Sequence, residues 1–197
     1  MSVTEQTTKD EQNKEINWLG SELIVPATSN ELEAAKKWAE TNPYGYDSDG
    51  GVRTYEEYIE DVLTGELGEI LAARGLEYAL NETGYFVFDR VSEKKTVSGD
   101  LILNDGTTLE VKTTQGWRQN TSTAYFRNPA GKNPDVLICA TLMRASKVPG
   151  EYVLLITHAD EYQKAYDNSE KYRRGAHEKR KVKKTELQSF SEWVNNL

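Results

Sequence analysis

The sequence is poor in cysteine and histidine, with one Cys and two His, and no apolar run approaches the ~18 residues of a membrane span. A single cysteine excludes an internal disulfide and fits a reducing compartment. The polar start, MSVTEQTTKDEQNKE, has no apolar signal core. We therefore expect a cytoplasmic, intracellular protein that is not secreted and has no membrane partner.

Several common kinds of site are also missing from the sequence. No Cys/His spacing is typical of a zinc site, and there is neither a P-loop nor a dinucleotide-binding fingerprint. Cys139 lies in the apolar run DVLICATL, which favours a small buried core residue over a reactive thiol. His158 ends another apolar run, so we expect a structural histidine there rather than a general base.

The chain does have enough apolar content for one folded domain, and its charge is unevenly spread. It is 197 residues long, 37% apolar, with four Trp and a net charge of −8. Residues 1–66 carry 15 Asp and Glu against 5 Lys and Arg, whereas residues 171–184 carry 8 Lys and Arg against one Glu. The basic segment can present a local phosphate-binding surface, or it can be a solvated helix face or tail.

The order of patterns along the chain predicts a single domain after a tail. We expect a disordered tail over 1–20, helices within 28–81, a catalytic sheet within 85–158 and a basic, helical segment over 159–197, so that one domain spans 21–197. Helices followed by several strands and a last helix indicate an α/β fold with a central mixed sheet flanked by helices.

Capping signals mark the starts of the predicted helices. Thr28 or Asn30 can cap the first helix, and Thr54 begins a capping box for the second. The second helical pattern passes Gly65 and ends near Asn81. It therefore predicts either one long helix or two consecutive ones.

Residues 98–115, SGDLILNDGTTLEVKTTQ, combine two short apolar runs with three charged residues. A two-residue turn at Asp105-Gly106 would place Leu101 opposite Glu110, which mixes apolar and charged side chains on both faces. A three-residue turn with Gly106 left-handed places Leu101 opposite Leu109. The apolar residues then share one face, so we predict the three-residue turn.

The same register gathers charged side chains on the other face. Asp100 lies opposite Glu110, with Lys112 one step along the strand, and cross-strand neighbours are ~5 Å apart at Cβ. Two adjacent carboxylates suit a hard divalent cation such as Mg²⁺, and the backbone carbonyl of Val111 is a further candidate ligand. Such an ion assists phosphodiester hydrolysis, in which Lys112 can orient or deprotonate water or stabilise charge on the phosphate. An ordinary polar face on an edge hairpin is the simpler alternative.

Asp100 followed by Glu110-Val111-Lys112 at the end of an apolar strand, downstream of a glutamate-bearing helix, resembles the PD-(D/E)XK nuclease superfamily of restriction endonucleases, Holliday-junction resolvases and repair nucleases. The resemblance covers roughly residues 65–158. It implies a restriction-endonuclease-like α/β core with a central mixed sheet of about five strands, Mg²⁺ as cofactor (Mn²⁺ substituting) and DNA as partner. One departure is Gly99, where the family motif has Pro.

The resemblance also assigns roles within this sequence. It implies that Asp100 and Glu110 are metal ligands and Lys112 the catalytic lysine. In the helix GELGEILAARGLE the accessory ligand is Glu69, four residues after Gly65, with Glu66 in reserve. Gln115, just after the strand, resembles a trailing polar residue that some members use near the site.

Residues that contact DNA are expected in two segments. Aromatic and cationic side chains alternate within 115–134, a combination that suits base stacking and phosphate contact, although this segment can equally form an extra hairpin. Backbone contacts are expected from the basic segment 171–184. The candidates are Trp117, Arg118, Arg127, Lys132, Arg173, Arg174, Lys179, Arg180 and Lys181.

Two functions remain open at this point. The first is a Mg²⁺-dependent DNA endonuclease of the restriction, resolvase or repair type, which commonly works as a homodimer when it cuts two strands. The second is a non-catalytic nucleic-acid-binding or assembly protein that retains a nuclease-like fold.

Overall fold

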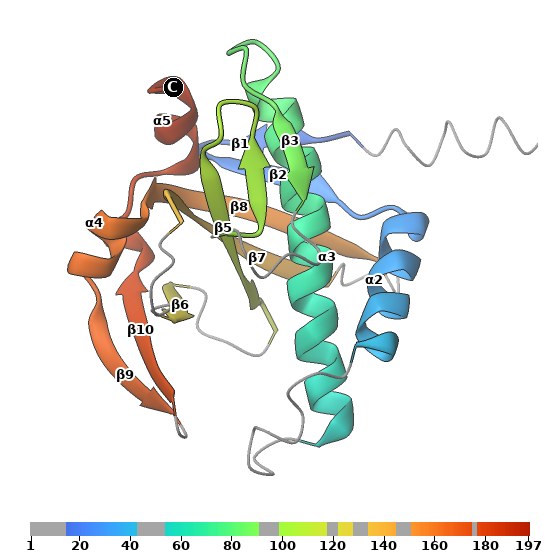
Figure 1. Cartoon of the computed structure of the whole chain (residues 1–197). Helices are drawn as coiled ribbons and strands as arrows, with labels where there is room; N and C mark the ends of the chain where they lie inside the picture. The colour runs from blue at the N-terminus through green and yellow to red at the C-terminus, as the bar shows by residue number, and fades with distance from the viewer. Residues whose placement is uncertain are drawn as a thin grey trace, which may run out of the picture.

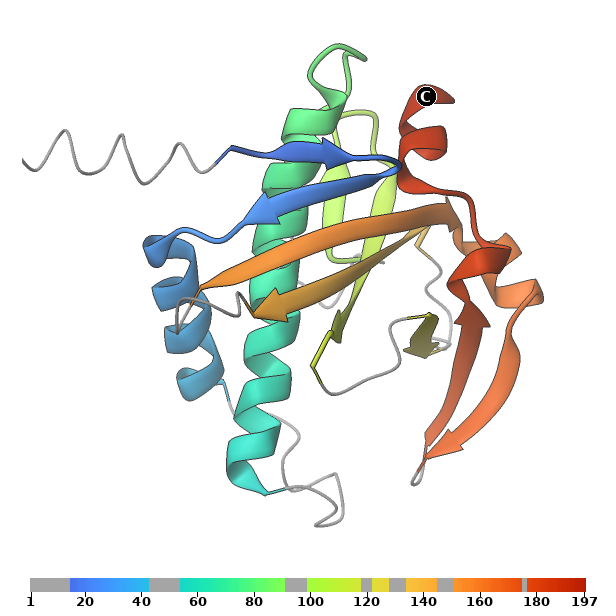
Figure 2. The ribbon, with the colours of Figure 1, turned by 180° about the vertical axis from the view of Figure 1, so that it is seen from behind.

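The computed structural model describes residues 15–42, 54–90, 99–117, 122–127, 134–144, 151–174 and 177–197, with the backbone alone at 127, 172–174 and 177–179. The described residues form an α/β structure with one large sheet and one small sheet. In Figures 1 and 2 the long helix α3 runs along one face of the large sheet, and the β9–β10 hairpin stands on the side away from α3.

The large sheet is mixed, as predicted, and has seven strands rather than about five. Its strand order is β1-β2-β8-β7-β5-β4-β3, and β5 and β7 are parallel while every other neighbouring pair is antiparallel. The bounds are β1 (Asn17–Leu19), β2 (Glu22–Pro26), β3 (Val87–Arg90), β4 (Leu101–Leu103), β5 (Thr108–Gln115), β7 (Val136–Arg144) and β8 (Tyr152–Glu161).

The two additional strands come from the N-terminal part of the chain. Asn17–Leu19 pairs with β2, so residues 17–19 belong to the sheet and not to the tail expected over 1–20. Residues 1–14 lie outside the described part. In β2 the alternate residues Leu23 and Val25 are buried. The sequence analysis does not predict this strand, because its run of apolar residues is short.

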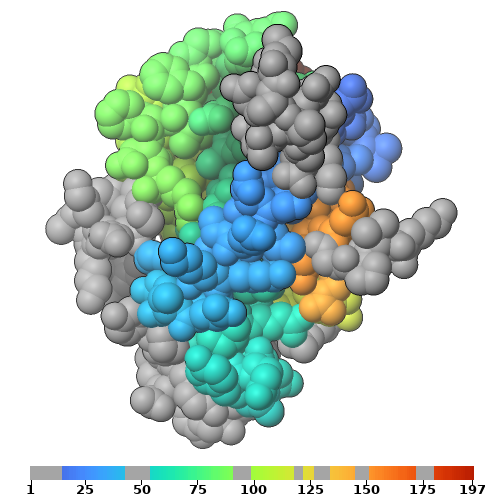
Figure 3. Space-filling view, turned by 90° about the vertical axis from the view of Figure 1, so that its right-hand side faces the viewer, coloured from blue at the N-terminus to red at the C-terminus, as the bar shows by residue number. Residues whose placement is uncertain are grey.

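The capping residues begin both long helices. Thr28 caps α2 (Ser29–Thr41) and Thr54 caps α3 (Tyr55–Leu80), each in a complete capping box. The α3 helix is 26 residues long and continues through Gly65. Of the two predicted alternatives, one long helix is therefore correct. Figure 3 shows α2 on the surface of the molecule beside the first turns of α3. No helix in the described ranges is long and apolar enough to cross a membrane.

The main core lies between α3 and the large sheet. Its buried members from the helix are Leu67, Leu71, Ala72, Leu76 and Leu80, and those from the sheet include Leu23, Val25, Leu101, Leu109, Val111, Ile138, Leu154 and Ile156. Gly68 allows a close approach, because a Cβ there would clash with the side chain of Thr113 on β5. The middle of α3 therefore lies directly against the strand that carries Glu110 and Lys112.

The small sheet has the order β6-β10-β9, with β6 (Thr123–Arg127), β9 (Glu170–Arg174) and β10 (His177–Lys183). The prediction of a basic helical segment is therefore wrong for 170–183. Backbone pairing with β6, about fifty residues earlier, supplies the hydrogen bonds of β10. Phe126 and Val182 pack with Leu137 and Cys139, so this sheet covers part of the large sheet's other face, and Cys139 is buried as expected.

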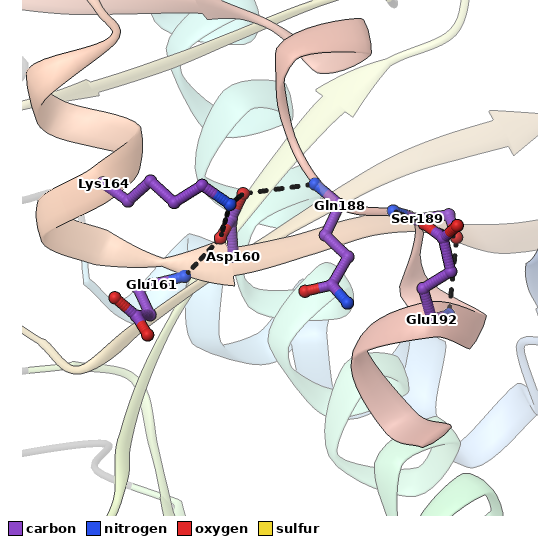
Figure 4. A network of polar contacts seen from close by, with 6 residues as sticks. All are labelled: Asp160, Glu161, Lys164, Gln188, Ser189 and Glu192. Carbon is purple, nitrogen blue, oxygen red and sulfur yellow. Dashed lines mark hydrogen bonds and ion pairs between the residues drawn. The ribbon is translucent and has the colours of Figure 1, made fainter. Parts of the chain in front are cut away.

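The C-terminal segment is fastened to β8 by a buried carboxylate. Asp160 accepts hydrogen bonds from Lys164 Nζ of α4 (Tyr162–Asp167), from the Glu161 N–H and from the Gln188 N–H, at 2.9, 3.0 and 3.2 Å (Figure 4). After the 3₁₀ helix η2 (Lys184–Glu186), Ser189 caps α5 (Phe190–Asn195) in a capping box. The apolar side of α5 supplies the terminal anchor that the sequence predicts, from Phe190, Trp193 and Val194.

Candidate active site

The β4–β5 hairpin has the predicted register. Leu101 pairs with Leu109, and Gly106 has a φ of 91° in the turn. The Leu103 N–H donates to the Thr107 carbonyl at 2.9 Å, and the Gly106 N–H donates to the Leu103 carbonyl at 2.9 Å. The apolar side chains of both strands face α3, so the intervening side chains of β5 face the opposite way.

Asp100 lies on a bend that precedes β4. Gly99 has a φ of 111° and lies so close to β5 that an added Cβ would be 2.8 Å from the Leu109 carbonyl oxygen. Beyond the bend, the Asp100 N–H donates to the same carbonyl at 2.7 Å, and Asp100 Oδ2 accepts a hydrogen bond of 2.7 Å from the Val111 N–H. The bend therefore fixes the carboxylate of Asp100 against the middle of β5.

Glu110 and Lys112 project from the face of β5 opposite α3 and form an ion pair. Their side chains are partly open to solvent, with exposed fractions of 23% and 29%. Burial lowers the pKa of Lys112, but attraction to Glu110 and Asp100 outweighs burial and raises the pKa above its ordinary value. Lys112 is therefore a fixed positive charge between two carboxylates.

The helix α3 adds a third carboxylate to this group. Burial, with repulsion from Asp100 and then Glu66, raises the pKa of Glu69 to about 8. Glu66 forms an ion pair with Arg90 of β3, whereas the carboxylate of Glu69 lies 4.0 Å from that guanidinium. Repulsion from Asp100 is the largest effect of a neighbouring charge on the pKa of Glu69.

The pKa of Asp100 is raised mainly by burial, as is that of Glu69. Burial raises the pKa of Asp100 to about 6, with a further contribution from Glu110, while Lys112 and the Val111 N–H act in the opposite direction. Negative charge at Glu69, Asp100 and Glu110 thus exceeds the positive charge close to it. We refer to Glu69, Asp100, Glu110 and Lys112 as the acidic cluster.

The acidic cluster has the ligand chemistry of a hard-cation site without the geometry of a complete one. All three acidic members offer carboxylate oxygens, and an added cation would relieve the repulsion that raises the pKa of Asp100 and Glu69. Within the described ranges, however, no three acidic, His or Cys side chains converge closely enough to hold one ion together. The residues therefore fit a Mg²⁺ held by two carboxylates and several waters.

Gln115 is not part of the acidic cluster. It lies on the same face of β5 as Val111, and its Nε2 donates to Thr64 Oγ1 at 2.9 Å and to Asp61 Oδ1 at 3.2 Å on α3. The resemblance implies a polar residue near the site, but an odd-numbered separation from Lys112 places Gln115 on the opposite face of β5. Its Oε1 is buried without a hydrogen-bond partner.

The residues predicted to contact DNA lie in different surroundings in the structure. Trp117 packs under Arg144, whose guanidinium lies 4.2 Å from the ring centroid. Arg180 donates to the Tyr166 hydroxyl at 2.8 Å and lies over that ring, while Lys181 forms an ion pair of 3.0 Å with Glu170. Arg118 and Lys132 lie outside the described residues. Arg127, Arg173, Arg174 and Lys179 belong to the small sheet, where the backbone alone is described.

Two charged residues that bear on the site were given no role there by the sequence. Arg90 of β3 pairs with Glu66, and its guanidinium lies 4.0 Å from the carboxylate of Glu69. Lys184 belongs to the basic segment from which backbone contacts with DNA are expected, but it is buried in η2, directly after β10. Neither position has a local signal, because both contacts depend on pairing between distant strands.

Comparison with known proteins gives no further assignment: no family model matches the chain, and no curated protein matches it significantly.

Proposed function

We propose that the protein is a Mg²⁺-dependent DNA endonuclease that hydrolyses phosphodiester bonds, with Mn²⁺ as a substitute metal. The observation that carries the proposal is the bend at Gly99, which fixes Asp100 beside Glu110 and Lys112 on the face of β5 opposite α3, where both side chains are partly exposed. The pKa values of Glu69, Asp100 and Lys112 are all shifted, which is more typical of a functional site than of an ordinary polar edge hairpin.

Each member of the acidic cluster has a role in this reaction. Mg²⁺ bound by Asp100 and Glu110, with the Val111 carbonyl as a further ligand, would polarise the phosphate and activate a water. Lys112 remains protonated and places positive charge where the phosphate gains negative charge. Glu69 of α3 is the candidate accessory ligand, since its carboxyl interacts electrostatically with Asp100.

The choice of DNA as substrate is supported by the basic segment on the small sheet. Strands β9 and β10 contain most of the 8 Lys and Arg of residues 171–184, in a chain whose net charge is −8. Contacts from such a segment would strengthen binding without selecting a sequence. The proposal includes an intracellular location and a homodimer for cutting both strands, and light scattering on the free and DNA-bound protein measures the oligomeric state.

The test is cleavage of supercoiled plasmid and of a four-way junction by wild-type protein in Mg²⁺, in Mn²⁺ and in EDTA. We expect nicking with either metal and none in EDTA. The Asp100→Asn variant should lose at least about 100-fold in rate, since it removes one metal ligand. Asp89→Asn is the matched control, because Asp89 is an exposed carboxylate on β3 and should leave the rate unchanged.

Two results would contradict the proposal. One is equal cleavage by the wild-type protein and Asp100→Asn, which would indicate a contaminating nuclease. The other is the absence of cleavage by folded wild-type protein on every DNA tested with both metals. A fixed sequence at the cut sites would indicate restriction, and symmetrical nicks in the junction would indicate resolution.

A non-catalytic nucleic-acid-binding or assembly protein is the second candidate, and one observation favours it. Glu110 is already neutralised by Lys112, and no three potential ligands converge within the described part of the chain. Calorimetry separates the two functions. DNA binding without measurable binding of Mg²⁺ or Mn²⁺ would favour the non-catalytic protein, whereas metal binding that is lost in Asp100→Asn would favour the nuclease.

A further inference from the structure

A cavity of about 360 Å³ lies on the face of the large sheet opposite α3. It is bounded by β2, β7 and β8 of the large sheet, by the start of β6 and by η2. Its polar lining consists of Glu22, Ser122, Thr141, Thr157, His158, Lys184 and Thr185. The volume falls within the range of pockets that bind small molecules.

The buried ammonium group of Lys184 is the main feature of this cavity. The residue is only 4% exposed, and its Nζ donates a single hydrogen bond of 3.1 Å to Thr141 Oγ1. Among the described residues no carboxylate lies within ion-pair distance of it. A lysine ammonium has three donors, and a buried charge with one neutral acceptor is costly unless an anion compensates it.

A second polar group of the lining also lacks a hydrogen-bond partner. His158 Nδ1 is buried without a hydrogen-bond partner. Burial, and then repulsion from Lys184, lowers the pKa of His158, so the ring is neutral at pH 7 and adds no positive charge of its own. Burial likewise lowers the pKa of Lys184, with opposing attraction from Cys139 and Glu22. An oxyanion at Lys184 would reverse this effect.

The other parts of the lining indicate what the anion is attached to. Met143 and Leu155 provide apolar walls, and Glu22 of β2 provides a carboxylate that can accept a hydrogen bond from an amino group. A cationic end, apolar walls and an acceptor match a phosphate joined to a flat ring system that bears an amine. A bare inorganic anion would leave the walls and Glu22 unused.

We propose that this cavity binds a phosphate group carried by a ligand of mononucleotide size, with the phosphate on the Lys184 ammonium. Two sources share this chemistry: a free nucleotide and the phosphorylated end of a nucleic-acid strand. The cavity lies near Lys112 on the same face of the sheet, because Thr141 pairs with Thr114, two residues beyond Lys112. The proposal goes beyond the proposed nuclease activity and does not require it.

The experiment is calorimetry in EDTA with the Asp100→Asn protein, so that cleavage plays no part. The probes are inorganic phosphate, deoxyadenosine, dAMP and one oligonucleotide with either a 5′-phosphate or a 5′-hydroxyl. We expect dAMP to bind at least 10-fold more tightly than deoxyadenosine. Lys184→Met should remove this difference, whereas Lys183→Met, the matched control on the exposed neighbouring lysine, should preserve it.

A second measurement needs no variant at Lys184. Acetic anhydride labels accessible amines, and mass spectrometry quantifies labelling at Lys184 in the unsubstituted protein. We expect dAMP to reduce that labelling several-fold while deoxyadenosine does not. If dAMP protects Lys184 no better than deoxyadenosine, or if no probe binds at millimolar concentration, the proposal is wrong. The same holds if Lys183→Met weakens dAMP binding as much as Lys184→Met.

The oligonucleotide arms distinguish the two sources. A strand with a 5′-phosphate that binds at least 10-fold more tightly than the 5′-hydroxyl strand, in a Lys184-dependent manner, indicates recognition of a strand end. Lys184-dependent binding of dAMP alone indicates a free nucleotide. Both outcomes support a phosphate site, and neither depends on whether the acidic cluster cleaves DNA.

Discussion

The carboxylate of Asp100 is bound to the backbone of Val111 by a hydrogen bond of 2.7 Å that crosses the β4–β5 hairpin. The contact uses the N–H between Glu110 and Lys112, so the acidic residue is held beside both side chains. The donor is a backbone N–H, so this hydrogen bond does not compete with the ion pair between Glu110 and Lys112. The backbone of the hairpin therefore fixes the position of Asp100.

We predict that Glu69 makes the protein less stable as the pH rises from about 4.5 to about 8. The ordinary pKa of 4.5 rises to about 8 in the folded state, so the folded protein holds a proton that the unfolded chain has released. Stability is therefore lost between these two values, by up to about 1.4 kcal/mol per pH unit. Urea unfolding in EDTA at pH 6.5 and pH 8 measures the loss.

Glu69→Gln should flatten this pH dependence because the amide cannot ionise. Glu77→Gln is the matched control, because Glu77 is an exposed carboxylate on the same helix. It should retain the slope. Equal slopes in the wild-type protein and Glu69→Gln would contradict the assignment of the raised pKa.

A second prediction concerns the influence of Lys112 on Asp100. Burial raises the pKa of Asp100 to about 6, and Lys112 is the largest influence in the opposite direction. Lys112→Met should therefore raise the Asp100 pKa above about 6. Carbon-13 NMR titration of the aspartate carboxyl groups measures the change directly, without any assay of activity.

The control for Lys112→Met is Lys164→Met, which removes the partner of the buried carboxylate of Asp160. This change should leave the titration of Asp100 where it is. A lower or unchanged Asp100 pKa in Lys112→Met would show that the ammonium does not act on that carboxylate.

A third prediction tests the bend before β4. Gly99→Ala requires an alanine at a φ of 111° and places a methyl group 2.8 Å from the Leu109 carbonyl oxygen. Gly20→Ala requires a positive φ of 62° as well, but nothing lies within 4 Å of the added carbon. Strain alone costs about 1–2 kcal/mol, so Gly99→Ala should be at least about 1 kcal/mol more destabilising than Gly20→Ala in denaturant unfolding. Equal losses would mean that the backbones move apart easily.

A fourth prediction concerns the attachment of the small sheet. Phe126 is buried with its ring 5.4 Å from that of Tyr162 in an edge-to-face contact, and Phe126→Ala should cost about 3–5 kcal/mol of local or global stability. Hydrogen exchange should rise in β6 and β10 while β5 and β7 remain protected. Tyr125→Ala, one residue earlier on the outer face, should change exchange little. A uniform rise across both sheets would show that they unfold as one unit.

The register of the hairpin could be predicted because it depends on local information. The positions of Leu101, Leu103, Leu109 and Val111, and a glycine that tolerates a positive φ, leave one turn length that places these four side chains on one face. The capping boxes at Thr28 and Thr54 are local for the same reason, since each joins residues three apart. Short-range geometry was sufficient in all of these cases.

The small sheet could not be predicted from local patterns. Residues 177–183, HEKRKVK, have a single apolar side chain, Val182, so neither strand nor helix periodicity is visible. Pairing with β6 decides the conformation, and Lys184 becomes buried only because the sheet closes over Thr141. The partners of Gln115 could not be predicted for the same reason. Alternation along β5 gives the face on which Gln115 lies, but its partners on α3 depend on how the helix packs on the sheet.

The sequence by itself determined the hairpin register, the capped helices and the grouping of Asp100, Glu110 and Lys112, because each follows from hydrogen bonds or alternation over a few residues. Tertiary structure alone decided the surroundings of the two glutamates, since Arg90 on a distant strand pairs with Glu66 and the charge of Asp100 acts on Glu69. It also decided that one lysine of a basic segment is buried beside a cavity. Contacts between segments far apart in the chain set the charges around each ionisable group, and no local pattern encodes them.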